Sequence, residues 1–332
     1  MDNKAATVYP WLQAYWHQLS RYEQQDRLPN AMMLVGDKAL GLSAFATAFA
    51  QRTICLSVTA NGAACGVCDS CLLFNAGNYP DFFHIAPEEG QSTIKIGAIR
   101  ELIESLALSN QYAKPRIVII DPADAMLHQA ANSLLKTLEE PSENTCLVLI
   151  AEKPSKVSAT IRSRCQLITV KGIDLSQATS WLEAEGCDQA EQYLNLANHL
   201  PLLAYDLWKK QALAARVEIF NDFIAMLNGK LDPLLFAEKC FALKELPALK
   251  WIMSWLTDAT KVAFEPNNMC LMNPDLKDGL KVLVEKLHLN NTHGLLDKLA
   301  MLISLESSQL NQQLLLEDFA IQCYLLTVKR KV

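Results

Sequence analysis

The sequence predicts an α/β domain built on a parallel sheet, followed by helices up to the end of the chain. Two observations carry this prediction. Over residues 1–168, short apolar runs bounded by turn residues alternate with helical patterns, an order typical of a parallel sheet covered on both faces. After Val170 no further strand pattern appears, and the helical patterns are interrupted by Gly and Pro residues.

Four apolar runs predict buried strands, and a fifth run is a weaker candidate. The four strands are expected at Ala31–Val35, Ile117–Ile120, Cys146–Ile150 and Gln166–Val170, and the weaker one at Phe82–Ala86. Helical patterns lie between them at Leu42–Cys55, Ile96–Leu108 and Ala130–Glu140. Pro141 stops the last of these, because proline cannot continue a helix.

The helical part of the chain divides into two predicted domains. Residues 169–210 have two or three short helical patterns, with breaks near Gly186 and Pro201, and residues 211–332 are helical throughout. We therefore expect three domains, at 1–168, 169–210 and 211–332.

Composition restricts the classes of function. The 332 residues are 51% hydrophobic and 20% charged, which is typical of a compact globular protein. A formal net charge of −6 argues against a stand-alone DNA-binding domain, so we expect any nucleic-acid contact to be local or made through a partner. No signal segment opens the chain and no apolar run could span a bilayer, which predicts a cytoplasmic protein without membrane contact.

Four of the ten cysteines form a cluster in the sequence. Cys65, Cys68 and Cys71 are separated by gaps of two residues, and Cys55 lies ten positions upstream. Such gaps let two thiolates bind one metal ion from a tight turn, and four thiolates complete the tetrahedral coordination of a structural zinc ion. An iron–sulfur cluster also uses four thiolates and is the alternative. The six scattered cysteines are expected to be buried thiols: Cys146, Cys165, Cys187, Cys240, Cys270 and Cys323.

The loop after the first strand has the spacing of a phosphate-binding loop but lacks its key residue. Such a loop reads G-x4-G-K-[ST], and its Lys reaches the outer phosphates of a nucleotide. Gly36, Gly41 and Ser43 are in register, whereas Leu42 stands where the Lys belongs and Lys38 is on the wrong side of the loop. The loop is therefore degenerate, and no ATP hydrolysis is expected from it.

The second half of a nucleotide site is also incomplete. Strand Ile117–Ile120 is followed by Asp121, a position suited to a magnesium ligand. The next residue is Pro122, where an ATPase needs an acidic side chain to activate water, and proline cannot act as a base.

Six segments within residues 9–165 resemble, in the same order, the delta-prime family of bacterial DNA polymerase III clamp-loader subunits, a branch of the AAA+ superfamily. They are Tyr9–Leu12, Gly36–Ser43, Cys65–Cys71, Tyr79–Asp81, Ala131–Pro141 and Ile161–Cys165. The loss of the Lys at Leu42 separates this family from the motor subunits, which keep an intact loop. The resemblance implies an AAA+ core with an inserted zinc knot over residues 55–71, then a small helical lid and a helical collar that joins the subunits.

The resemblance also implies an interface at Ser163-Arg164-Cys165. Arg164 would project into the ATP site of a neighbouring motor subunit and act there in trans, since a guanidinium stabilises charge on a transferring phosphate. Lys136 and Glu139, in the Ala131–Pro141 segment, would contact a neighbouring subunit. A helix-end arginine in a surface salt bridge is the plain alternative for Arg164.

As a member of this family the chain would be a subunit of a DNA-directed DNA polymerase holoenzyme without activity of its own. It would join gamma/tau motor subunits and the clamp-opening delta subunit in a hetero-pentamer that loads the sliding clamp on primed DNA, in the cytoplasm at the nucleoid-associated replication machinery. Two alternatives remain open: an active AAA+ motor with an unusual loop, and a zinc-knot nucleic-acid-binding module.

Overall fold

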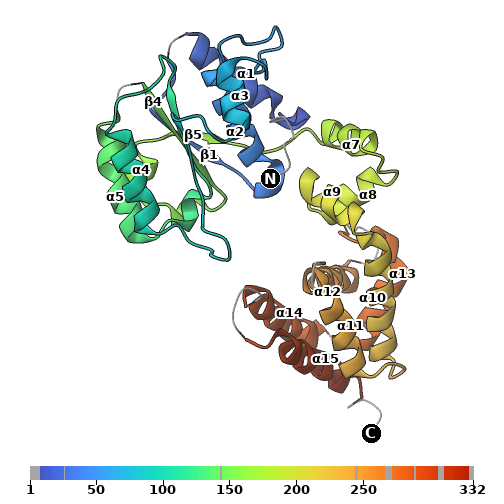
Figure 1. The fold of residues 1–332 in the computed structure, drawn as a ribbon. Coiled ribbons are helices and arrows are strands. Elements are labelled where there is room, and N and C mark those ends of the chain that lie inside the picture. Colours follow the sequence, from blue (N-terminus) through green and yellow to red (C-terminus); the bar gives the residue numbers. More distant parts are fainter. Residues whose placement is uncertain are drawn as a thin grey trace. The chain divides into compact units, whose positions relative to one another are not determined.

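The computed structural model describes residues 8–328, apart from Asp26, Glu143, 244–245, 266–270, His288 and 306–309. The described part of the first half contains a five-stranded sheet in which every neighbouring pair is parallel, in the order β2-β3-β4-β1-β5 (Figure 1). The strands are β1 (Ala31–Val35), β2 (Phe82–Ile85), β3 (Arg116–Ile120), β4 (Thr145–Ala151) and β5 (Gln166–Thr169). The expected α/β core is thus confirmed, and the weaker strand candidate is β2.

The three inner strands are fully buried because helices cover both faces of the sheet. In Figure 1, α4 and α5 lie together on one side of the sheet and α2 on the other. Alternate residues of β1, β3 and β4 form one hydrophobic cluster with α4 and α5. The helices here are α1 (Gln13–Gln24), α2 (Leu42–Ile54), α3 (Asp69–Asn75), α4 (Ile96–Leu106), α5 (His128–Glu139), α6 (Ala159–Arg162) and α7 (Leu175–Ala184).

The chain forms two compact units. The first comprises residues 1–188 with 200–202, and the second residues 189–199 with 203–332. Helix α7 belongs to the first unit, where Trp181 packs edge-on against Trp11 with ring centroids 5.3 Å apart. The division into three domains at 168 and 210 stays a prediction.

In the described part of the second unit, all the regular secondary-structure elements are helices. Helix α11 packs on α15, and α12 packs on α13 and α14, around the buried side chains of Phe223, Phe236 and Trp255. The helices are α8 (Ala190–Leu196), α9 (Pro201–Lys209), α10 (Ala212–Leu227), α11 (Pro233–Ala242), α12 (Ala248–Phe264), α13 (Lys277–Lys286), α14 (Leu289–Ser304) and α15 (Gln312–Val328).

Two expectations about the whole chain can be checked here. Five of the six scattered cysteines are buried, namely Cys146, Cys165, Cys187, Cys240 and Cys323. The sixth, Cys270, lies outside the described residues. Among the helices that the structure describes, none combines the length and apolar character needed to cross a membrane.

Candidate functional site

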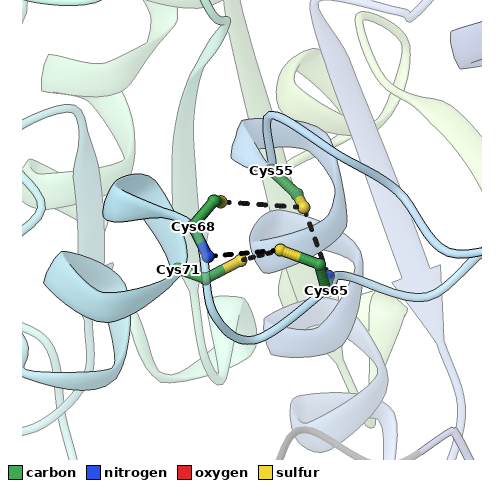
Figure 2. A group of neighbouring side chains, drawn as sticks. All are labelled: Cys55, Cys65, Cys68 and Cys71. Carbon is green, nitrogen blue, oxygen red and sulfur yellow. Dashed lines mark hydrogen bonds between the residues drawn. The ribbon is translucent and has the colours of Figure 1, made fainter.

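The four clustered cysteines converge on one point in space (Figure 2). Cys55 ends α2, Cys65 lies in the following loop, Cys68 precedes α3 and Cys71 is in the first turn of α3. The four Sγ atoms all lie within 4.8 Å of one another, and the pairs Cys55–Cys68 and Cys65–Cys71 are 4.0 Å apart. A tetrahedral zinc ion with bonds of about 2.3 Å holds its sulfurs about 3.8 Å apart. The four sulfurs therefore fit a single tetrahedral ion.

Backbone N–H groups donate to several of these sulfurs and lower the pKa of the Cys65 and Cys68 thiols, whereas burial raises the pKa of the Cys71 thiol. The N–H of Cys65 donates to Cys55 Sγ (3.2 Å), and the N–H of Cys68 donates to Cys65 Sγ (3.3 Å). Burial raises the pKa of the Cys68 thiol, but hydrogen bonds from the N–H groups of Leu56 and Cys71, together with those to the Cys71 and Cys65 side chains, outweigh it and bring this pKa to about 6. Thiolates are the metal-binding form of cysteine, so the hydrogen bonds at Cys65 and Cys68 favour that form at these two positions.

The donor set has the character of a structural site. Cys55 and Cys71 are buried, and within the described residues no histidine or carboxylate joins the four sulfurs. Gly66, between Cys65 and Cys68, has φ +75°, a left-handed conformation that suits glycine. The arrangement is thus compatible with four-thiolate zinc, as the sequence predicts, and the same donors would suit iron–sulfur ligation.

A buried arginine that sequence reasoning missed holds the loop between Cys55 and Cys65. Arg52 is 3% exposed, and its Nη1 donates to the carbonyl oxygen of Gly62. Its Nε donates to Glu23 Oε2 of α1 (2.6 Å), and its guanidinium lies 5.8 Å from the ring centroid of Trp16. The available signal was a single charged residue near the end of a helix of apolar and uncharged polar residues, three positions before a candidate ligand, Cys55.

The N–H groups of the degenerate loop form hydrogen bonds within the loop itself. Asp37 Oδ1 accepts the N–H of Ala39 (2.8 Å), while the N–H groups of Leu40 and Gly41 donate to the carbonyls of Asp37 and Lys38. In a working phosphate loop such N–H groups cradle the phosphates. Here internal oxygens already occupy them, so the loop offers no free set of donors at these positions.

Apolar side chains fill the space within this loop. Leu42 is 1% exposed, and its Cδ1 lies 3.1 Å from where a Cβ on Gly36 would be. The ring of Tyr9 covers Gly41 so closely that a Cβ there would lie 2.5 Å from a ring carbon. Ser43 is exposed beside this packing. Leu42 therefore does more than remove a positive charge, because it makes the loop part of the hydrophobic core.

The residues that follow β3, where an ATPase has its acidic side chains, form hydrogen bonds at the ends of the neighbouring strands. Asp121 follows β3, and its N–H donates to the carbonyl of Ile85 (2.9 Å). Asp124 Oδ1 accepts the N–H of Glu152 (3.1 Å), which ties the end of β3 to the end of β4. Pro122 occupies the position of the water-activating carboxylate, as the sequence indicates.

The Ser163-Arg164-Cys165 turn is anchored and presents the arginine outward. Cys165 is buried, and Ser163 Oγ donates to the carbonyl of Thr160 (3.0 Å). The Arg164 side chain is 33% exposed, and its Nη1 donates to the same carbonyl (3.0 Å). In this motif Ser163 closes the turn, Arg164 lies at the surface and Cys165 packs in the core.

The structure brings two of the expected interface residues together. Arg164 Nη2 donates to Glu139 Oε1 at the end of α5, an ion pair between side chains 25 residues apart in sequence. Lys136, one turn earlier on α5, is exposed. Leu134 and Leu138 of the same helix are buried in the core, which fixes the orientation of this outer face.

Comparison with known proteins identifies the family. The model of the DNA polymerase III delta subunit matches residues 11–174, and the model of its C-terminal part matches residues 210–323. A DNA polymerase III subunit delta′ of Pseudomonas aeruginosa is 30% identical, over 96% of this chain and 97% of its own. This chain belongs to the DNA polymerase III subunit delta′ family. The delta′ subunit of Escherichia coli is 33% identical over 76% of each chain.

The match to a tau/gamma subunit covers a smaller part of the chain than the match to the Pseudomonas aeruginosa delta′ subunit. The tau/gamma subunit of Haemophilus influenzae is 31% identical over 48% of this chain and 22% of its own length. The delta′ subunit of Pseudomonas aeruginosa instead matches the sheet and the helical second half together. The family assignment therefore confirms the resemblance seen in the sequence.

Proposed function

We propose that this delta′ family member is a non-catalytic subunit of a DNA polymerase III clamp loader and that Arg164 completes the ATP site of a neighbouring motor subunit. One combined observation supports this proposal. The chain's own phosphate loop is filled by Leu42 and its amides are internally bonded, whereas Arg164 is exposed on an anchored turn. The chain has lost the groups needed to hydrolyse ATP itself and kept one that can act outward.

The chemistry of arginine suits this role. Its guanidinium stays charged at every physiological pH and forms a planar fork of N–H donors that matches phosphate oxygens. Placed beside a γ-phosphate, it stabilises the charge that spreads over the transferring group, as arginine fingers do. The anchored backbone of Ser163 and Cys165 would keep the finger at a constant height above the surface.

The proposed assembly is a hetero-pentamer with gamma/tau motor subunits and a clamp-opening delta subunit. The complex would act on the sliding clamp and primed DNA, in the cytoplasm at the nucleoid-associated replication machinery. Residues 211–332 would form the collar that joins the subunits, and residues 169–210 the lid. Family membership over nearly the full chain supports this arrangement.

We further propose that Cys55, Cys65, Cys68 and Cys71 hold structural Zn²⁺. The ion would cross-link the end of α2 to the start of α3 and leave no position for a reacting water. Metal analysis and visible absorption separate the two candidate groups: a colourless protein with one zinc supports zinc, and a brown protein with iron supports a cluster.

Reconstitution of the loader tests the arginine. Arg164→Ala should assemble normally but lower ATP turnover and clamp loading, because one site loses its transition-state stabilisation. Arg164→Lys keeps the charge but not the fork and should restore only part of the activity. Arg162→Ala, on the same turn, is the matched control. Wild-type turnover with Arg164→Ala would disprove the finger.

The isolated protein distinguishes the two rival functions. An active motor would bind ATP with magnesium, and a zinc-knot nucleic-acid module would bind primed DNA with a steep dependence on salt. We expect neither, because the loop is filled and the chain has a net charge of −6.

A further inference from the structure

The guanidinium of Arg164 is held by two groups of its own chain. Nη1 donates to the carbonyl of Thr160 (3.0 Å), and Nη2 donates to the carboxylate of Glu139. From this geometry we infer that Glu139 is a positioning residue that holds Arg164 in the outward orientation it needs in a neighbour's ATP site. The inference rests on the proposed function, and it replaces the expectation that Glu139 itself contacts a neighbour.

The backbone around Arg164 is fixed by a helix cap and by buried side chains, so the position of the guanidinium depends on the contacts of its own side chain. Helix α6 is capped by Ser158, whose side chain accepts the N–H of Ile161 (3.3 Å). Ile161 and Cys165 are buried in the hydrophobic cluster under the turn. A long arginine side chain on this base has many rotamers in water, and ordering it costs conformational entropy at the moment of docking. A contact made beforehand removes part of that cost.

The two contacts leave the working part of the guanidinium available. Arginine has five N–H donors, and Thr160 and Glu139 each take one, so three remain for phosphate oxygens. Because Thr160 and Glu139 bind different terminal nitrogens, they restrain rotation of the guanidinium plane as well as its position.

The strength of the Arg164–Glu139 ion pair decides whether Glu139 orients the arginine or keeps it away from a neighbouring nucleotide. The side chains of Arg164 and Glu139 are 33% and 48% exposed, and solvent-exposed ion pairs shift an equilibrium by at most about five-fold. A contact this weak cannot keep a guanidinium away from a nucleotide triphosphate, to which arginine makes stronger, charge-assisted bonds. Glu139 is therefore suited to orient the finger and not to withhold it.

A double-mutant cycle in the reconstituted clamp loader tests this inference. The four loaders contain the wild-type chain, Glu139→Ala, Arg164→Ala or both changes, and kcat and KM for ATP are measured in each. We expect Glu139→Ala to lower kcat by about two- to five-fold, the range of an exposed ion pair, with KM unchanged. In the Arg164→Ala background the same change should have no further effect, because Glu139 acts only through the arginine.

Two further variants complete the experiment. Glu139→Gln keeps an acceptor oxygen and should recover part of the lost kcat, an effect that a purely structural role would not produce. Glu140→Ala is the matched control. Glu140 directly follows Glu139, is exposed and makes no ion pair among the described residues. This variant should have the wild-type kcat.

Each outcome decides a different question. If Arg164→Ala leaves turnover unchanged, the proposed function fails and the inference fails with it. If Arg164→Ala lowers turnover but Glu139→Ala changes nothing, raises kcat or acts equally in both backgrounds, the finger stands and Glu139 is not its positioning residue.

Discussion

Leu42 converts a catalytic position into a packing position. Its side chain is 1% exposed and fills the space beside Gly36, while Asp37 takes an amide that a phosphate would otherwise bind. A change at this one residue can therefore remove the packing without rebuilding the cradle. The internal hydrogen bonds and the apolar filling involve the loop as a whole and not position 42 alone.

Restoring the missing lysine should not restore nucleotide binding. We expect Leu42→Lys to bind no ATP with magnesium and to destabilise the first unit by about 3 kcal/mol, because a large buried side chain is replaced by a charged one. Equilibrium binding and urea unfolding measure the two effects. Ser43→Ala, at the exposed neighbouring position, is the control and should change stability little. Tight ATP binding by Leu42→Lys would show that the cradle is intact.

For single residues, the sequence predicted which side chains matter better than it predicted which other side chains they contact. The missing lysine could be read from the spacing of the loop and the motif around Arg164 from the family resemblance, because each is defined by neighbouring residues. The contact between Arg164 and Glu139 could not, because it joins the ends of two elements 25 residues apart. Arg52 was missed for the same reason, since its partners Glu23 and Gly62 come from separate segments.

Among the elements, the interior strands were predictable and their ends were not. A continuous apolar run identifies a strand buried on both faces, which is why β1 was placed correctly. Strand β3 begins one residue earlier than expected, at Arg116, a charged residue that is only 2% exposed. Asp81 pairs with it inside the protein, and hydrophobic patterns do not report such a pair.

The Asp81–Arg116 pair joins the edge of the sheet to the chain after α4. Asp81 Oδ2 accepts the N–H groups of Gln111 and Tyr112, and Arg116 donates to the carbonyls of Leu106 and Leu108. Asp81→Ala should lower the free energy of unfolding by about 3 kcal/mol, since it leaves a buried guanidinium without its counter-charge. Urea unfolding measures the change.

An exposed pair provides the comparison for Asp81→Ala. Asp278 and Lys281 lie on the surface of α13, with side chains 97% and 57% exposed. Asp278→Ala should leave the urea midpoint unchanged within error, because water already screens this pair. Equal effects of the two substitutions would contradict the importance given to burial.

Metal removal should loosen one segment of the first unit. We expect a strong zinc chelator, or Cys68→Ser, to remove the metal, lower the melting temperature and expose residues 56–71 to proteases, because a four-thiolate site stabilises the segment that supplies its ligands. Metal analysis, thermal melting and limited proteolysis measure these effects.

Cys146→Ala is the control for the metal experiment. Cys146 is buried in β4 and lies outside the cluster, so this variant should lose some stability but keep its metal. A Cys68→Ser protein with full zinc content and unchanged melting would mean that the cluster does not hold a structural ion.

For the whole molecule, assembly should depend on the last helix. Leu314, Ile321 and Leu325 of α15 are 60%, 37% and 46% exposed, while Phe319 and Cys323 of the same helix are buried. If residues 211–332 form the collar, Leu325→Asp should weaken assembly with motor subunits at least ten-fold, because it places a charge on an apolar surface. Analytical ultracentrifugation of mixed subunits measures the affinity.

The matched control for the collar adds the same charge elsewhere on the helix. Gln322 is exposed and polar, so Gln322→Asp should assemble as wild type does. Both variants should keep the wild-type circular dichroism spectrum. Unchanged assembly of Leu325→Asp would place the subunit contacts outside this face of α15.

Arg52 makes the cysteine segment hard to separate from the domain that carries it. The residue belongs to α2, yet one of its acceptors is the carbonyl of Gly62 inside that segment and another is Glu23 on α1. A shortened chain in which a tight turn replaces residues 56–71 would take the Gly62 acceptor away from Arg52 and leave the ion pair with Glu23. A deletion of the cysteine segment therefore also alters the environment of Arg52 in α2, and such a design has to treat the segment and the helix before it together.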